Sequence, residues 1–223
     1  MKPDQVWKNF RLGEELNISG TFIYTGMRRF HEVRVLDRSE DIFEVLYNLS
    51  VGFERLFKTA VVLLEHNDSI KQAELEASLI THNHQELLKR IKEHVKVNLS
   101  SPHNDLLALL SKFYKSYRYE RFTLSSAYDS KNEMVELCRF FEKHLGVEIN
   151  TNDRLFGTPN EPQFRKFLRK TVLKISSAIY QIICDAARSI ALYTYELRSG
   201  SRAEAVFLGE IDVADEDVLW KEL

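Results

Sequence analysis

The chain has 223 residues, of which 44% are hydrophobic, and only four prolines and eight glycines. This is enough for one domain with a buried core, and it leaves little sequence for flexible linkers. No apolar run approaches the ~20 residues that span a bilayer, and residues 1–12 lack the apolar stretch of a signal peptide, so we expect a cytoplasmic protein without membrane contact. Cys138 and Cys184 lie in helical patterns, where burial is expected rather than a disulfide.

Charge is distributed unevenly along the chain. Residues 203–223 hold seven acids and one lysine, a net of −6, so residues 1–202 carry +4 of the overall −2. A basic body with an acidic C-terminal tail can bind nucleic acid while the tail competes for the same surface. The alternative interpretation of the tail is a solvated end of the chain.

The N-terminal part has the weakest pattern. Residues 1–20 show no strong period, and Gly13 and Gly20 interrupt them. We therefore predict a short irregular N-terminal segment, followed over residues 21–34 by a short helix or an extended stretch.

A long amphipathic helix is predicted next. Ser39 is followed by two acids, as is typical of a helix N-terminus, and apolar residues continue at helical spacing to His66. Residues 70–80 form a short helical pattern, and Thr81 or Asn83 begins another helix.

Two further helices precede residue 150. Ser101 is placed to cap one of them, with Pro102 at its first position. Ser130 and Glu133 have the spacing of a capping box for the other, and Gly146 ends it.

The second long amphipathic helix is predicted over residues 160–199. Asn160 can cap its start, Pro162 suits its first turn, and Gly200 follows its last periodic residue. Its apolar positions average about 3.7 residues apart, close to the period of an α-helix. They are Phe164, Leu168, Val172, Ile175, Ile179, Ile182, Ala186, Ile190, Tyr193 and Leu197.

Residues 205–213 could form a short strand and residues 215–223 a final helical turn. No series of strands with alternating polarity occurs, so we predict an all-α helical bundle. Residues 1–202 are expected to form one helical domain, with residues 203–223 as its acidic tail.

Common catalytic motifs are absent from the sequence. There is no Gly-rich phosphate loop, CxxC, HExxH or GxSxG, and no cofactor is predicted. His82 and His84 stand two residues apart, and on a helix they would point about 200° away from each other, so a polar helix start is expected rather than a metal site.

Arg139 and His144 are the candidate catalytic residues. RNA can be cleaved without metal when a histidine moves the 2′-hydroxyl proton and a cation stabilises charge on the phosphate. Five residues rotate about 140° around a helix, so the two side chains would meet on one phosphate only across a kink or a dimer interface. The alternative is a solvent-facing arginine and a partly buried histidine near a helix C-terminus.

A second candidate is a surface for RNA. Cations bind phosphates and aromatic faces stack on unpaired bases, so a segment in which they alternate suits RNA. The candidate residues are Lys112, Lys115, Arg118, Tyr119 and Arg121. Phe113, Tyr114 and Tyr117 are expected in the core.

A further basic cluster comprises Arg165, Lys166, Arg169, Lys170 and Lys174. It is interpreted either as a solvated face or as a binding surface.

Taken together, residues 40–146 resemble the HEPN superfamily of small helical bundles, which includes RNases of toxin–antitoxin and antiphage systems. The resemblance lies in four segments, the helix from Leu46 to Lys58, the helix start from Thr81 to Leu88, the cluster Tyr117-Arg118-Tyr119, and Arg139 to His144. It implies that Arg139 and His144 form the RNase pair together with their copies from a second subunit. The phenylalanine at position 140 departs from the polar residue that usually follows the arginine in active members.

Three functional hypotheses follow. The first is a metal-independent endoribonuclease acting as a homodimer. The second is a noncatalytic helical module that dimerises and serves as a scaffold or partner protein in a defence or toxin–antitoxin complex. The third is a ligand pocket lined by Tyr180 and Tyr193.

Overall fold

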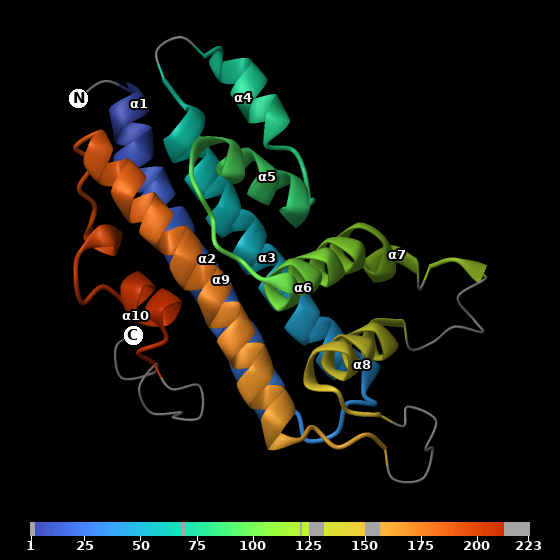
Figure 1. Cartoon of the computed structure of the whole chain (residues 1–223). Helices are drawn as coiled ribbons and strands as arrows, with labels where there is room; N and C mark the ends of the chain where they lie inside the picture. The colour runs from blue at the N-terminus through green and yellow to red at the C-terminus, as the bar shows by residue number, and fades with distance from the viewer. Residues whose placement is uncertain (1–2, 68–69, 121, 125–131, 150–156, 212–223) are drawn as a thin grey trace.

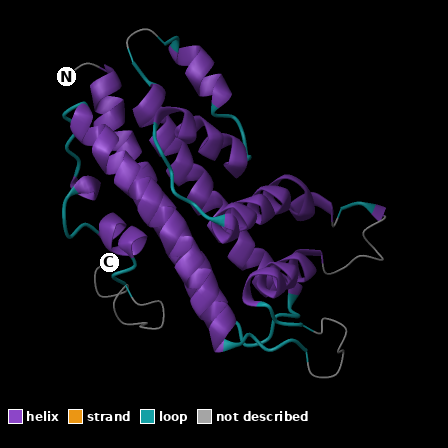
Figure 2. Cartoon of the chain, viewed as in Figure 1, coloured by secondary structure: helices purple, strands orange, loops and turns teal. Residues whose placement is uncertain are grey.

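A computed structural model describes residues 3–67, 70–120, 122–124, 132–149 and 157–211. Their regular structure is helical (Figure 2). One isolated antiparallel bridge joins Val35 and Pro159. The predicted all-α bundle is confirmed. None of the described helices combines the length and hydrophobicity that a membrane span requires.

Three long helices form the centre of the bundle (Figure 1). They are α2 (Leu12–Glu32), α3 (Ser39–Glu65) and α9 (Pro162–Ser189). Around α3 pack the shorter helices α5 (His84–His94), α6 (Ser101–Lys112) and α8 (Asn132–Leu145). The remaining α-helices are α1 (Pro3–Val6), α4 (Gln72–Ser78), α7 (Arg118–Glu120) and α10 (Arg202–Leu208).

The prediction of an irregular N-terminus is wrong. Residues 3–11 are helical as α1 and the π-helix η1 (Trp7–Arg11), and α2 begins directly after them. Gly13 and Gly20, which interrupt the sequence pattern, both lie within α2, and a Cβ at Gly20 would be 3.7 Å from Phe207 of α10. Two other glycines, Gly26 and Gly52, lie where α2 and α3 approach closely. A Cβ at Gly52 would lie 2.6 Å from Ile23 Cγ1, and one at Gly26 would lie 2.8 Å from Leu49 Cγ. These glycines therefore allow close helix packing and do not interrupt the helix.

The helix predicted over residues 160–199 is shorter than expected, because α9 ends at Ser189. Ala191 adopts φ +52°, and the Leu192 amide donates to the Ala187 carbonyl at 2.9 Å, which turns the chain back. Tyr180 then donates to the Glu196 carbonyl at 3.1 Å, so the following residues run back along α9. The apolar spacing beyond residue 189 arises from this returning segment, which contains the short 3₁₀ helix Tyr195–Leu197.

Asn160 is not the cap predicted for α9. Its side-chain amide instead donates to the carbonyls of Phe30 at 2.8 Å and Val33 at 2.9 Å, and its backbone amide donates to Arg34 at 2.8 Å. Asn160 thereby satisfies the C-terminal carbonyls of α2 and joins them to the start of α9.

The strand predicted over residues 205–213 is also wrong. Residues 202–208 form α10, which Ser201 caps by accepting from the Glu204 amide at 3.1 Å. Gly209 at φ +75° ends the helix. The turn of helix predicted over 215–223 lies outside the described residues.

Most other predicted boundaries agree to within two residues. Asn83 caps α5, and Gly146 at φ +66° follows α8. The cap of α6 is Ser100, one residue before the predicted Ser101, and it forms a capping box with His103. Ser130 lies outside the described residues.

Candidate functional site

The predicted catalytic residues Arg139 and His144 lie on α8 and bind different carboxylates. Arg139 Nη1 lies 2.8 Å from Glu136 Oε1, and 67% of its side chain is exposed. His144 Nε2 lies 2.8 Å from Asp105 Oδ2, and only 9% of its side chain is exposed. Within one chain the structure therefore shows a solvent-facing arginine and a partly buried histidine that contact different carboxylates.

A shallow groove of about 240 Å³ between α6 and α8 is lined by both carboxylates, Asp105 and Glu136, and by Arg139. Lys112 reaches Glu136 at 3.4 Å, and Lys143 reaches Asp105 at 2.7 Å. The hydrogen bond from Lys143 lowers the pKa of Asp105 below its usual value, so the carboxylate is charged at neutral pH. Each carboxylate in the groove is thus shared by two basic side chains.

His144 is also enclosed by aromatic rings. Phe140 lies 5.1 Å from its ring in an edge-on contact, and Phe167 lies 6.0 Å away. Phe140, the departure from the HEPN pattern, is itself buried against α9. This environment favours a packing role for His144 in the single chain, because a general base must reach a substrate hydroxyl.

The predicted RNA-binding residues divide between two faces. Lys112 lies over the Tyr117 ring at 4.8 Å, beside α8. Arg118 lies 3.9 Å from the Tyr114 ring and 4.5 Å from the Tyr119 ring, and Tyr114 in turn contacts Tyr47 of α3 and His82. Lys115 is exposed.

Arg121 lies outside the described residues. As expected, Phe113, Tyr114 and Tyr117 are buried.

A polar cluster that the sequence analysis did not identify as a site lies beside Arg118. Its centre is Glu54 on α3, a carboxylate that is only 8% exposed. Glu54 Oε1 lies 2.5 Å from Lys58 Nζ, and Oε2 lies 2.9 Å from His82 Nδ1. The His82 ring contacts the Tyr114 ring edge-on at 4.9 Å. We call Glu54, Lys58, His82, Tyr114 and Arg118 the Glu54 cluster.

The imidazole of His82 is accessible, because 50% of its side chain is exposed. Its hydrogen bond to Glu54 occupies Nδ1 and fixes the ring, which presents the other nitrogen, Nε2, as the reactive atom. Burial, followed by the charge of Glu54, raises the pKa of Tyr114, so this phenol keeps its proton. The arrangement can accept a proton at His82 and bind an anion at Lys58 and Arg118.

His84 lies on the inner side of the same helix start and is fully buried. Its Nε2 donates to the Ser50 carbonyl at 2.8 Å, and its Nδ1 lies 3.2 Å from Ser111 Oγ. Desolvation lowers the pKa of His84 to about 4, so the ring is neutral. His82 precedes α5 and binds Glu54, whereas His84 binds the Ser50 carbonyl in the core. Among the described residues, no three or more His, Cys, Asp or Glu side chains are grouped as metal ligands.

A π-helix sets the direction of the aromatic residues in the Glu54 cluster. After Lys112 the chain continues as η2 (Phe113–Tyr117) and then α7. A π-helical turn holds more residues than an α-helical one and is frequent at functional sites. It brings Tyr114 and Arg118, four residues apart, together on the face where Tyr114 contacts Tyr47 of α3 and His82.

The third hypothesis is not favoured by the placement of its residues. Tyr180 is buried against Phe207, whereas Tyr193 is 77% exposed, so they do not line one pocket.

A sequence signal for the Glu54 cluster did exist. Glu54 and Lys58 have the i,i+4 spacing of an ion pair, and His82 precedes the helix cap, but nothing in the sequence shows that the two elements meet.

Comparisons with known proteins give no match to a family model, to a curated protein or to a solved structure.

Proposed function

We propose that this chain is an RNA-binding helical protein of the cytoplasm that cleaves RNA without a metal ion, with the Glu54 cluster as its active site. The observation that supports this most directly is the buried Glu54 carboxylate, which holds an accessible histidine on one oxygen and a lysine on the other. The HEPN resemblance supports the same reaction class.

His82 acts as the general base in this proposal. Its Nε2 accepts the proton of a ribose 2′-hydroxyl, the 2′-oxygen attacks phosphorus, and the 5′-oxygen leaves and takes a proton from water. The products are a 2′,3′-cyclic phosphate and a 5′-hydroxyl end. Glu54 stabilises the imidazolium that forms at His82.

Lys58 and Arg118 supply the positive charge that the transition state requires. Lys58 is paired with Glu54, and Arg118, which lies over the Tyr114 ring, adds a further positive charge that favours a phosphate. The aromatic ring of Tyr119 is 55% exposed next to Arg118 and is available to stack on a base.

The Arg139–His144 pair is the competing site for the same reaction. It requires a homodimer in which a second copy brings the two residues to one phosphate, as the resemblance implies. In the single chain His144 is turned towards Asp105 and shielded by Phe140 and Phe167.

The test is cleavage of single-stranded RNA by the purified chain in the presence of EDTA, with the product ends identified. His82→Gln should lower the rate about 10²- to 10⁴-fold, the usual contribution of a general base. His94→Gln is the matched control, since His94 is also a partly exposed histidine near a carboxylate, 3.9 Å from Glu65. It should leave the rate unchanged.

Two outcomes would overturn the assignment. Loss of activity in His144→Gln but not in His82→Gln would place the reaction at the α6/α8 groove, and light scattering would then be expected to show two chains. Absence of cleavage for all RNAs, at high protein concentration, would favour the noncatalytic scaffold. Thermal unfolding of each variant separates loss of chemistry from loss of fold.

A further inference from the structure

A second polar hollow lies away from the Glu54 cluster, between the C-terminal end of α2 and the first turns of α9. It is a groove of about 410 Å³, within the size range of small-molecule sites. Met27, Phe30 and Leu168 form an apolar floor. The remaining lining consists of Pro162 and four basic side chains, His31, Arg165, Lys166 and Arg169. We call this hollow the α2/α9 groove.

The charge of the α2/α9 groove is of one sign. Among the described residues that line it, none is acidic. This differs from the α6/α8 groove, where Asp105 and Glu136 neutralise the basic side chains. A hollow with several cations and no carboxylate attracts an anion.

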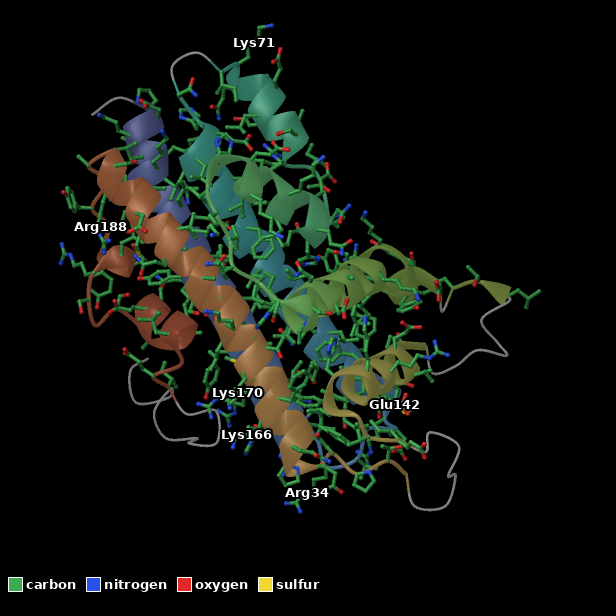
Figure 3. The ribbon with its side chains drawn as sticks, in the orientation of Figure 1. Arg34, Lys71, Glu142, Lys166, Lys170 and Arg188 are labelled. Carbon is green, nitrogen blue, oxygen red and sulfur yellow. The ribbon has the colours of Figure 1, made fainter. Side chains whose placement is uncertain are left out.

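Two of the cations are well placed for a ligand. Arg165 Nη1 donates to the Asn160 carbonyl at 2.5 Å, which fixes the guanidinium at the mouth of the groove. Lys166 is exposed and projects with Lys170 from the side of α9 that faces away from α8 (Figure 3). The N-terminal end of the 28-residue helix α9 lies here, and its dipole adds to the attraction for negative charge.

We propose that the α2/α9 groove binds the phosphate group of a nucleotide. Arg165 and Lys166 bind the phosphate, and the apolar floor of Met27 and Leu168 contacts the sugar or base. A phosphate matches an arginine and a lysine together better than a carboxylate does, because its oxygens accept several charge-assisted hydrogen bonds. The nucleotide is either free or part of an RNA chain, and the RNA case rests on the proposed function.

The test is calorimetric titration of the full chain with inorganic pyrophosphate and with adenosine 5′-diphosphate. Both should bind, and the nucleotide should bind more tightly because it also covers the apolar floor. The double variant Arg165→Gln and Lys166→Glu should weaken both affinities about tenfold or more, as expected for lost charge-assisted hydrogen bonds. The control, Lys89→Glu with Lys92→Glu, changes two exposed lysines of α5 and should alter affinity less than twofold.

Absence of binding at millimolar ligand, or an equal loss in the control, would overturn the proposal. A third titration separates free nucleotide from RNA. It uses a single-stranded RNA 12-mer and the His82→Gln chain, which is not expected to cleave it. If the 12-mer binds more tightly than the diphosphate, and adding Arg165→Gln and Lys166→Glu removes this difference, RNA is the ligand of the groove. The reverse order of affinities identifies a free nucleotide.

The groove and the active site can fail separately. If nucleotides bind in the groove but no RNA is cleaved, the proposed nuclease is wrong and the phosphate site stands. If RNA is cleaved and the groove variants bind normally, the phosphate site is wrong and the nuclease stands.

Discussion

Replacing His84 by glutamine should change how the stability of the protein depends on pH. His84 is fully buried, donates to the Ser50 carbonyl and has a pKa lowered to about 4 by desolvation. Glutamine keeps an N–H donor of similar reach but cannot take up a proton. The variant therefore removes one titration and keeps a polar group that can still satisfy Ser50.

The expected magnitude follows from proton linkage. The ordinary pKa of histidine, 6.5, applies to the unfolded chain, so between pH 6.5 and about 4 the unfolded state binds a proton at His84 and the native state does not. The free energy of unfolding therefore falls as the pH is lowered through this window. Each pKa unit corresponds to about 1.4 kcal/mol, so His84 contributes about 3 kcal/mol of acid destabilisation over the whole window.

Urea unfolding of both proteins at pH 7 and pH 4.5 measures this contribution. The wild-type chain should lose about 2.5 kcal/mol more than His84→Gln between the two pH values. Glu54, Lys58 and His82 face the same region and remain in both proteins, so their titration largely cancels in the difference. Equal losses in the two proteins would show that His84 is not held neutral by burial, and the reasoning would fail.

Two further predictions concern packing and burial. Gly52→Ala should destabilise the protein by about 1–3 kcal/mol in urea unfolding, because the new Cβ would lie 2.9 Å from the Ile23 backbone nitrogen. The control is Gly20→Ala, whose Cβ would lie at least 3.7 Å from Phe207. It should be neutral or stabilise the protein by up to about 1 kcal/mol. Equal effects of the two substitutions would contradict the close approach of α2 and α3. Burial raises the pKa of the Cys138 thiol to about 12 and also raises that of Cys184, so neither should react with a thiol reagent at pH 8 until denaturant is added. Rapid labelling of the native chain would refute their burial.

The helical fold was predictable where an apolar stripe at helical spacing continues over several turns, as in α3 and α9. Prediction failed where tertiary contacts decide the local structure. Gly13 and Gly20 look like breaks in the sequence, yet both lie within the continuous helix α2. The end of α9 depends on a turn at Ala191 that has no glycine to mark it.

The candidate site was harder to predict for the same reason. Arg139 and His144 stand out in the sequence because they are close along one helix, yet each binds a carboxylate that the sequence does not reveal as its partner. Glu54 and His82 are 28 residues apart and meet only because α5 packs against α3. A single sequence carries no signal for such a contact.

The amide of Asn160 also has a consequence for synthesis of the chain. It joins residues about 130 positions apart, so this junction closes only after most of the chain has left the ribosome. The α2–α3 hairpin can pair much earlier, because its helices are neighbours in the chain. At typical elongation rates α9 emerges on the order of ten seconds later. During this interval the apolar face that α9 will cover is open to other newly made chains or to a chaperone.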